Sequence, residues 1–516
     1  MHRSFSALLA FLGLSVQAQL PPYVAAGFPA GGSGYSFFTT TDFGGNIAQS
    51  NAVILDGEGH VAYRRTAPSV TNFRVWPDGR MSYAAAGRNI LLDSTFAVID
   101  TVVCVNGIDT DLHDIRLLPN GHYLLLGTEE RTMDLSAYHY FQPNNAPGSP
   151  TATVKCGVVQ ELDANKALVW EWHLADHFDF LETDTTLLGN PGQVDWSHCN
   201  AVEQDTDGNV LLSCRHFNEV VKIDRNADTV IWRLGGVSND FTFTNDGGFV
   251  GQHDIRRIAN GHITLFDNGL SGVHPCRGVE YALDEVNRTA EAVWSRSFDN
   301  LSYSRAMGSV QRLSDGSTLI GWGALSPANS LFDVYAPDST LVREVRFTDT
   351  LVTYRAFHFD ALPFQLHRPE ITCMGQDTTY LLTADAGWSS YVWSTGATGP
   401  TTTVAAYDTV YVEVSPGPGS GWVRSEPFVP ADHCGAAGIA AEALDPARLW
   451  PNPARDHVDI ILGETTRTDL DLLDAYGRLL WSTVLQGDRI TVPLSAYPPG
   501  MYLVRMQGRV FRLVKE

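Results

Sequence analysis

The stretches HDIRLLPNGHYLLLG at residues 113–127 and HDIRRIANGHITLFDNG at residues 253–269 decide the fold of this chain. Each stretch has an apolar run on both sides of an Asn-Gly pair. Asn and Gly tolerate the positive φ angles of tight turns, so each stretch predicts two antiparallel strands joined by a short hairpin. Related phrases with an Asp-Gly turn recur at 72–85, 198–215 and 308–323.

A second kind of hairpin alternates with the first. It consists of an apolar strand, an Asp-containing turn and, in most copies, a strand with a Val and a Trp, and it occurs at 52–63, 158–172, 220–236 and 279–294. Two hairpins give four strands, which is one blade of a β-propeller. At a period of roughly 40 to 55 residues, the repeats predict a six-bladed β-propeller over residues 30–365. A sustained helical periodicity is missing from the sequence, which excludes a helical solenoid.

The residue pattern of the sequence changes after Pro369. Residues 370–434 alternate apolar and polar positions between Gly, Thr and Ser turns, which predicts an immunoglobulin-like β-sandwich. Short alternating strands return in residues 446–516, where we expect a small C-terminal β-sandwich. The whole chain is therefore predicted to be all-β.

Charge and leader sequence restrict the class of protein. The chain has 58 Asp and Glu against 35 Lys and Arg, a formal charge of −23, which repels nucleic-acid phosphates and anionic membranes. Residues 1–18 combine a basic start, an apolar run and a small residue before the expected cleavage point, and they predict a secretory signal peptide. Later stretches fall short of the roughly 20 apolar residues of a membrane helix. We expect an exported protein without a membrane span or a nucleic-acid partner.

Seven cysteines leave at least one thiol unpaired, and they contain no CxxC pair. Cys373 and Cys434 flank one segment and are the most plausible disulfide in an exported chain. Cys199 and Cys214 lie beside suspected site residues, and the sequence leaves open whether they pair or are simply buried.

Three histidines occupy one position in the repeat. His113 lies seven residues before Asn120, His253 lies seven residues before Asn260, and His198 fits the same place if its loop has two extra residues. The first strand of each propeller blade lines the central channel, so we expect the three imidazoles to converge. A single histidine on a strand is usually a packing residue, but three equivalent ones favour a site.

Two arginines suggest the ligand of this site. Arg215 ends the second strand of the His198 hairpin, and Arg277 follows in the next blade. A guanidinium repels a divalent metal ion but binds an oxyanion through paired hydrogen bonds. We therefore expect a pocket for a sulfate or phosphate ester that uses neither a metal ion nor a cofactor.

The ordered phrases DWSHCN (195–200), QHD (252–254) and FDNG (266–269) resemble the bacterial arylsulfotransferase family. Members of this family are six-bladed propellers that move a sulfuryl group between phenols without a nucleotide donor. The resemblance implies that His253 is the nucleophile that becomes a sulfohistidine. It also implies that the sulfuryl oxygens and the proton are handled by His113, His198, Arg215 and Asn200. We expect further substrate contacts from Arg277 and Ser309.

Two further features follow from resemblance. Familiar family members have an N-terminal β-domain associated with dimerisation, whereas propeller-like sequence begins here soon after the leader, which favours a monomer. The phrases WPNP (450–453), DAYGRLL (474–480) and GMYLVRM (500–506) are similar to the C-terminal sorting domain of type IX secretion. This similarity implies handling by the type IX secretion machinery and release from the cell or attachment to its surface.

The leading hypothesis is an aryl sulfate sulfotransferase that works by ping-pong exchange, with an aryl sulfate as donor and a phenol as acceptor. Two alternatives stay open. One is a surface adhesin or anion-binding propeller without turnover, and the other is an aryl sulfate hydrolase in which water replaces the phenol. The set of His113, His198, Arg215 and His253 favours an enzyme over an adhesin.

Overall fold

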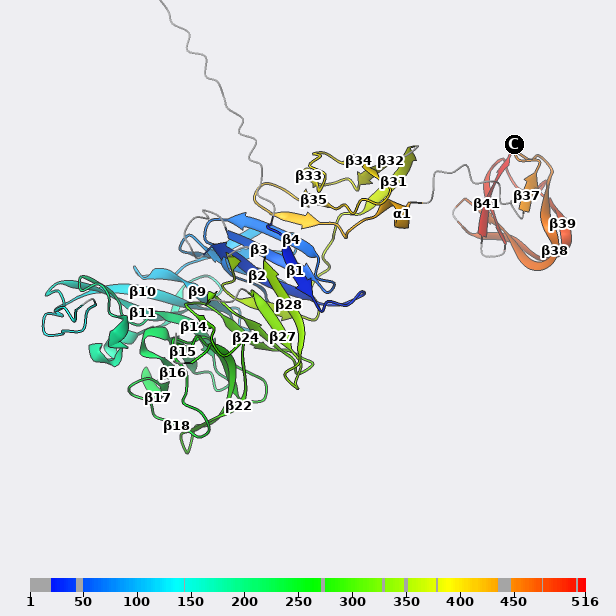
Figure 1. Ribbon diagram of the computed structural model, residues 1–516. Coiled ribbons are helices and arrows are strands. Elements are labelled where there is room, and N and C mark those ends of the chain that lie inside the picture. Colours follow the sequence, from blue (N-terminus) through cyan, green and yellow to red (C-terminus); the bar gives the residue numbers. More distant parts are fainter. Residues whose placement is uncertain are drawn as a thin grey trace, which may run out of the picture. The chain divides into compact units, whose positions relative to one another are not determined.

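The computed structural model describes residues 20–42, 50–142, 144–270, 274–326, 330–347, 351–376, 379–434, 447–475, 477–506 and 509–516 (Figure 1). The predicted signal peptide at 1–18 lies outside these residues. The chain forms two compact units. One holds the chain up to Thr372 together with Leu382–Val429, and the other holds Cys373–Leu381 together with Pro430–Glu516.

Six small antiparallel sheets follow one another in the described part of the first unit. The first sheet contains β2 (Tyr35–Asp42), β3 (Ser50–Asp56), β4 (Val61–Ala67) and β30 (Ala356–Phe359). The second contains β5 (Thr71–Val75), β6 (Met81–Ala85), β7 (Arg88–Leu92) and β8 (Val98–Val102). The third contains β9 (Asp109–Leu117), β10 (Tyr123–Met133), β11 (Ala152–Leu162) and β12 (Leu168–His173).

The remaining three sheets have the same up-and-down order. The fourth contains β14 (Cys199–Gln204), β15 (Val210–Cys214), β16 (Glu219–Asp224) and β17 (Thr229–Gly235). The fifth contains β19 (His253–Arg257), β20 (Ile263–Asp267), β21 (Arg277–Asp284) and β22 (Thr289–Ser297). The sixth contains β24 (Ser309–Arg312), β25 (Thr318–Gly321), β27 (Phe332–Tyr335) and β28 (Leu341–Phe347). The prediction of an all-β chain is confirmed.

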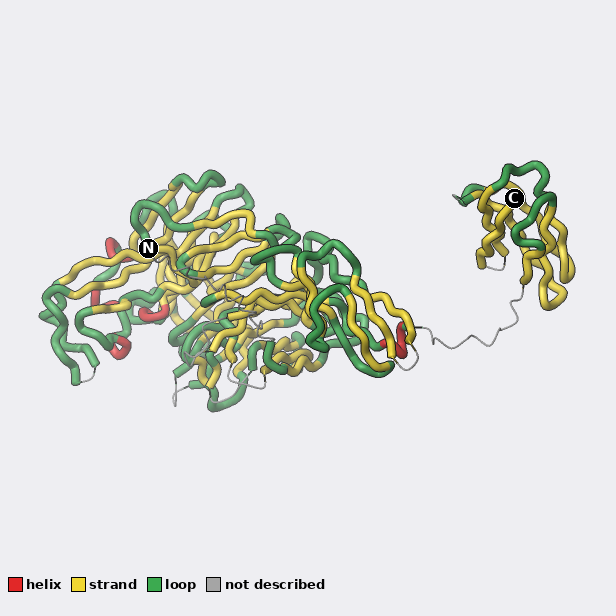
Figure 2. Tube along the Cα trace, turned by 90° about the horizontal axis from the view of Figure 1, so that it is seen from above, coloured by secondary structure: helices red, strands yellow, loops and turns green. Residues whose placement is uncertain are grey.

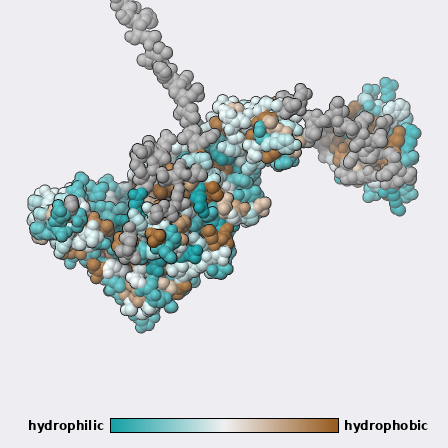
Figure 3. All heavy atoms as spheres, in the orientation of Figure 1, coloured by the Kyte–Doolittle hydropathy of each residue, from teal (hydrophilic) through white to brown (hydrophobic). Residues whose placement is uncertain are grey.

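Short elements complete the first unit, and Figure 2 shows how small its helical parts are. β13 (Gln193–Asp195) and β18 (Thr242–Phe243) add parallel to β11 and β22, β29 (Leu351–Val352) pairs with β2, and β23 (Tyr303–Ser304) pairs with β26 (Leu325–Ser326). The 3-10 turns are η1 (Leu174–Asp176), η2 (Phe180–Glu182), η3 (Thr185–Leu187) and η4 (Arg215–Phe217). In the view of Figure 3, hydrophilic residues cover most of the described surface of this unit, with scattered apolar spots.

The hairpins form where the sequence predicts them. Gly121 and Gly261 have φ angles of 84° and 87°, a left-handed conformation that other residues rarely adopt. Each of these turns is closed by backbone hydrogen bonds, such as the 2.9 Å bond from the Gly121 N–H to the Leu118 carbonyl. The apolar residues of the flanking strands then pack between neighbouring sheets. Trp172, Trp196 and Phe217, for example, belong to one buried cluster.

The sheets close into a propeller-like ring through strands from the two ends of the unit. The innermost strands β30, β5, β9, β14, β19 and β24 contact one another in this cyclic order. β30 pairs with β2, with Phe359 opposite Tyr35, and β1 (Tyr23–Ala26) pairs with β28 of the sixth sheet. The innermost strand of the first sheet is β30, which comes more than 300 residues after β2 in the sequence.

Part of residues 370–434 extends the first sheet. β33 (Ser390–Trp393), β35 (Val412–Ser415) and β36 (Trp422–Arg424) continue it beyond β4. Trp422 lies opposite Arg64, whose guanidinium forms a buried ion pair of 2.6 Å with Glu413 of β35. A separate sheet contains β31 (Ile371–Gln376), β32 (Thr379–Ala384) and β34 (Thr401–Ala405). The predicted disulfide between Cys373 and Cys434 is confirmed.

The second unit includes one sheet of long strands after the short helix α1 (Pro430–His433). Its strands are β37 (Ala447–Trp450), β38 (His457–Asp474), β39 (Leu479–Pro493), β40 (Gly500–Met506) and β41 (Arg509–Lys515). Val458, Leu472 and Val504 are among the side chains that fill its core. In the described parts of the chain, no helix has the length and apolar character needed to cross a membrane.

Candidate functional site

The innermost strands of the third, fourth and fifth sheets are each interrupted by an irregularity where a histidine lies. The pairing register shifts between Leu125 and Gly127 opposite β9, between Cys199 and Ala201 in β14, and between His253 and Arg256 in β19. Such bulges bend a strand and re-aim its side chains, and they are frequent near active sites. His198 has a φ of 45°, which agrees with a backbone turned away from regular strand geometry.

The structure brings the three histidines together into what we call the imidazole cluster, composed of His113, His198 and His253. The ring centroids of His113 and His198 are 5.0 Å apart, and those of His198 and His253 are 6.5 Å apart. Three consecutive sheets therefore contribute one imidazole each, with the ring of His198 next to both of the others.

His253 is the buried member of the cluster, with 1% of its surface exposed. Its Nδ1 lies 2.7 Å from Asn268 Oδ1 and 3.1 Å from the Gly251 carbonyl, both of which only accept hydrogen bonds. The backbone N–H of Met307 donates to its Nε2 at 3.1 Å. These contacts assign the proton to Nδ1 and the lone pair to Nε2.

Electrostatics keep His253 neutral. Burial holds the pKa of His253 well below its usual value, and the positive charge of Arg215 and the neighbouring His198 lower it further. A neutral imidazole with an oriented lone pair is a nucleophile at ordinary pH, whereas an imidazolium is not.

The other two imidazoles are each paired with a carboxylate. His113 Nδ1 lies 2.5 Å from Asp111, and His198 Nδ1 lies 2.6 Å from Asp195. Burial alone would lower the pKa of His113, but the charge of Asp111 outweighs burial and the pKa is raised. Burial opposes ionisation of Asp195, yet the hydrogen bond from His198 brings its pKa down to about 2. Both pairs are suited to proton transfer at Nε2.

Arg215 supplies the positive charge of the site. It begins η4, and its backbone N–H donates to the His198 carbonyl at 3.1 Å. One guanidinium nitrogen donates to the Arg305 carbonyl at 3.0 Å, but its buried Nε has no hydrogen-bond partner among the described residues. A buried charged donor without a partner is costly, so this group is suited to receive an oxyanion.

Asn200 is fully buried between the fourth and fifth sheets. Its Nδ2 donates to the Gln252 carbonyl at 2.7 Å, which is one residue before His253, and its Oδ1 has no partner within the described chain. This contact fixes the strand that carries the buried imidazole against the strand that carries His198. Asn200 is therefore placed to position His253, and its Oδ1 is able to accept a further hydrogen bond.

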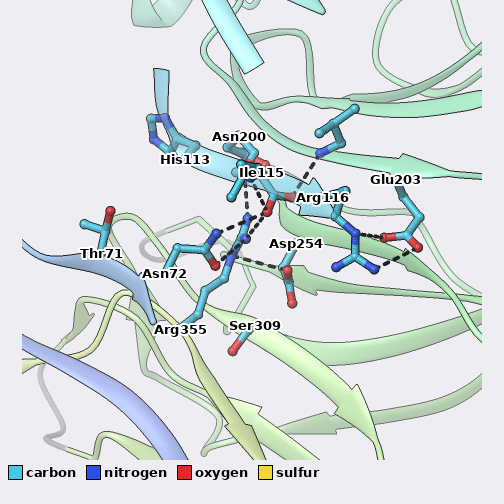
Figure 4. Close-up of polar contacts among 12 residues, drawn as sticks. Thr71, Asn72, His113, Ile115, Arg116, Asn200, Glu203, Asp254, Ser309 and Arg355 are labelled. Atoms are coloured by element: carbon cyan, nitrogen blue, oxygen red, sulfur yellow. Dashed lines mark hydrogen bonds and ion pairs between the residues drawn. The ribbon is translucent and has the colours of Figure 1, made fainter. Parts of the chain in front are cut away.

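Polar residues from the innermost strands of five sheets, together with the residue directly before β30 of the first sheet, form a layer that we call the floor ring. Its members are Asn72, Asp114, Asn200, Asp254, Ser309 and Arg355. Figure 4 labels its members except Asp114. Arg355, with 1% exposure, donates to Asn72 Oδ1 at 3.1 Å, to Asp114 Oδ1 at 3.0 Å and to the Asn200 carbonyl at 2.8 Å. Its Nε forms an ion pair of 3.2 Å with Asp254.

The floor ring is coupled to the imidazole cluster by chain connectivity. Asp114 directly follows His113, and Asp254, with a φ of 60°, directly follows His253. Arg256 adds ion pairs of 2.7 Å and 2.8 Å to these two carboxylates. The network therefore holds the backbone at the points from which two of the three imidazoles project.

Two predicted substrate contacts have other partners in the structure. Arg277 donates to Asp267 at 3.0 Å and to Asp246 at 2.8 Å, and its recorded contacts do not include the imidazole cluster. Ser309 Oγ donates to the Ala356 carbonyl at 3.2 Å and accepts the Ala356 N–H at 3.0 Å. Both side chains thus tie strands together.

Sequence reasoning missed several residues around the cluster: Asp111, Asp195, His216, Asn268 and Arg355. The first two precede their histidines by two and three residues, a spacing that is visible in DLH and DWSH.

His216 lies with its ring 4.8 Å from that of His198, and burial lowers its pKa to about 4. Together with Asp195 and His198 it has the spacing to hold a metal ion, as do Asp56, His60 and Glu426 elsewhere.

A pocket of about 410 Å3 opens beside His113 and His198. Its lining includes Asp109, Lys155 and Ser197 in addition to the two histidines and their carboxylate partners. This space is large enough for an aromatic ring next to the imidazoles.

Comparison with known families places two segments of the chain. The family model described as arylsulfotransferase (ASST) matches residues 43–355. The chain belongs to the arylsulfotransferase family. The secretion system C-terminal sorting domain matches residues 448–515, so the protein is secreted or attached at the cell surface by the type IX route. The family consists of sulfotransferases, and the matched residues include all three members of the imidazole cluster.

More distant comparisons add little. No curated protein matches the chain. A protein of unknown function from Bacteroides caccae is 10% identical, with a TM-score of 0.39 over 62% of this chain and 99% of that one. Virginiamycin B lyase from Staphylococcus aureus is 7% identical, with a TM-score of 0.33 over 70% of this chain and 96% of that one. PorZ from Porphyromonas gingivalis is 10% identical, with a TM-score of 0.26 over 90% of this chain and 68% of that one.

Proposed function

We propose that this arylsulfotransferase family member moves a sulfuryl group from an aryl sulfate to a phenol through a sulfohistidine at His253, without a nucleotide or metal cofactor. The observation that carries the proposal is a neutral imidazole next to a guanidinium that can bind an anion. His253 is neutral and buried with its lone pair on Nε2, and it lies beside Arg215, whose buried Nε has no partner among the described residues.

In the first half-reaction, Arg215 and the imidazoles hold the sulfuryl oxygens of the donor while its aryl ring occupies the pocket beside His113. His253 Nε2 turns its lone pair from the Met307 N–H to sulfur, an N–S bond forms, and the S–O bond to the aryl group breaks. His113, whose pKa is raised by Asp111, gives its proton to the departing phenolate oxygen. Asn268 Oδ1 keeps accepting the hydrogen bond from Nδ1–H and so stabilises the charged ring.

In the second half-reaction, the free phenol has left and an acceptor phenol takes its place. The now neutral His113 removes the phenolic proton, the phenolate oxygen attacks sulfur, and the N–S bond breaks to restore neutral His253. Each proton released is thus taken up again by the same imidazole. The two steps share one site and one sulfuryl carrier, which gives ping-pong kinetics.

We also interpret the six sheets as the blades of a six-bladed β-propeller over residues 30–365, followed by an immunoglobulin-like module at 370–434 and the sorting domain at 446–516. The channel of such a propeller is where side chains of different blades meet, as those of the imidazole cluster do. We also propose a monomer, since a single chain suffices to bring the three imidazoles together.

The test is release of nitrophenol from 4-nitrophenyl sulfate by the purified full chain, with and without an added phenol. We expect release that depends on the acceptor. Mass analysis of the donor-only reaction should show one added SO3 group on the intact protein and, after digestion, on the peptide with His253. His253→Ala should abolish both signals. The matched control is His262→Ala in the same sheet, because His262 pairs with Glu280 and has no recorded contact with the cluster.

Other outcomes would identify other functions. Release without an acceptor indicates a hydrolase. Binding of the sulfate ester without release indicates an anion-binding module. Full activity of His253→Ala would overturn the assignment of the nucleophile.

A further inference from the structure

Cys199 and Cys214 lie opposite each other in the hairpin that carries the site. They are register partners on β14 and β15, and their Sγ atoms are 3.4 Å apart. Cys199 directly follows His198, and Cys214 directly precedes Arg215. Both side chains are buried, with exposures of 6% and 0%.

The backbone at this position suits a cross-strand disulfide. The Arg215 N–H donates to the His198 carbonyl, which holds the residues next to Cys199 and Cys214 against each other. Cα atoms of directly opposite residues in antiparallel strands are about 4.5 to 5.5 Å apart, inside the range of about 4.4 to 6.8 Å found for disulfides. The sulfur atoms need to approach by only about 1.4 Å to reach bonding distance.

The surroundings leave Cys199 Sγ few other directions. Gly157 of the third sheet lies against it, and a Cβ at that position would collide with this sulfur atom. The compartment also favours oxidation, because the protein is secreted or attached at the cell surface and its Cys373–Cys434 pair is a disulfide.

We propose that Cys199 and Cys214 form a second disulfide in the exported protein, which links the strand of His198 to the turn of Arg215. The oxidant is a disulfide of a thiol oxidoreductase or of a small thiol. One cysteine thiolate attacks it and releases the first thiol, and the other cysteine attacks the mixed disulfide and releases the second. Two S–H bonds are lost from the protein, one S–S bond forms, and both protons end on the reduced oxidant.

The bond is structural and forms during folding. Burial, together with the hydrogen bond and charge of Cys199, raises the pKa of the Cys214 thiol well above its usual value, so exchange is slow once the hairpin is packed. The cross-link closes a short loop of sequence separation 15. It holds the backbone at His198 and Arg215 in register whether or not the protein turns over a sulfate ester, so it is independent of the proposed function.

The direct test is thiol counting on the full chain exported by a cell with an oxidising periplasm. The protein is denatured in acid without reductant, alkylated and digested for mass spectrometry. Of the five cysteines outside the Cys373–Cys434 pair, two are expected in a cross-linked peptide, which leaves three alkylated: Cys104, Cys156 and Cys276. Alkylation of both Cys199 and Cys214, or a cross-link that joins Cys156 to Cys199, would overturn the proposal.

A second measurement uses variants. Cys199→Ala/Cys214→Ala should melt several degrees below the wild-type chain, because the unfolded state loses a covalent constraint. Cys104→Ala removes a buried thiol from another cluster and is the control for loss of packing alone. If the Cys373→Ala/Cys434→Ala chain, which lacks the other disulfide, melts at the same temperature before and after full reduction, the hairpin has no such bond.

Discussion

His253 and His113 occupy the same place in the repeat, yet their surroundings give them opposite properties. His253 faces an amide oxygen and lies near Arg215, and its pKa is far below normal. His113 faces the carboxylate of Asp111, and its pKa is raised. The repeat therefore supplies equivalent imidazoles, and burial together with the nearby charges shifts the pKa values of His253 and His113 in opposite directions.

The floor ring holds the backbone next to both His113 and His253. Removal of its central arginine should therefore have the largest effect on stability. Arg355→Met leaves Asp114 and Asp254 with Arg256 as their remaining cation and should lower the free energy of unfolding by about 3 kcal/mol. Urea denaturation measures this change. Arg346→Met breaks a surface pair with Glu344 and should change stability by less than about 1 kcal/mol. Equal losses for the two substitutions would mean that the floor ring stabilises the fold no more than a surface ion pair does.

The contrast can be reversed at Asn268. Asn268→Asp puts a carboxylate next to His253 Nδ1, as Asp111 is next to His113, and so raises the pKa of His253. The protonated ring has no lone pair on Nε2, so transfer at pH 7 should fall and recover as the pH rises. Single-turnover rates across pH measure the change.

Asn268→Ala separates charge from orientation. It removes the acceptor without adding charge, so the rate should fall without acquiring a new pH dependence. Asn226→Ala, in an exposed turn, is the control. A pH profile of Asn268→Asp that runs parallel to that of Asn268→Ala would contradict the role of tautomer and charge at His253.

The smallest expected effect is at the His113 pair. Asp111→Asn removes the group that raises the pKa of His113, so the alkaline limb of kcat/KM should move to lower pH. For donors with poor leaving groups we expect about a tenfold slower reaction at pH 8, which corresponds to about one pKa unit. Glu291→Gln, an exposed acid on β22, is the matched control. An unshifted profile would remove His113 as the proton donor.

The free energy of unfolding should also depend on pH through the pair of His113 and Asp111. The raised pKa of His113 contributes stability that is complete below the unfolded value of about 6.5 and is lost as the pH rises through the folded value. The lowered pKa of Asp111 contributes stability that is present above the unfolded value of about 3.9. Wild type should therefore exceed Asp111→Asn most between about pH 4 and pH 6.5, as measured by denaturation at several pH values.

The sequence by itself determined the strands, their turns and the positions of the three histidines. Hairpins are local structures: the Asn-Gly pair at 120–121 and the apolar runs on either side of it contain nearly all the information for one. Counting from such turns placed His113, His198 and His253 at one position in three repeats. The phrases of the tail similarly indicated the sorting domain, because they are contiguous.

Only the tertiary structure decided how the ring closes and what each polar side chain meets. The pairing of β30 with β2 joins residues more than 300 positions apart, and no local pattern contains that register. In the sequence Arg277 is typical of an anion-binding group, but in the structure it donates hydrogen bonds to Asp246 and Asp267. No sequence pattern indicates the role of Arg355. Burial and partner charge fix the chemistry of an ionisable group, and both are set by residues that are distant in sequence and near in space.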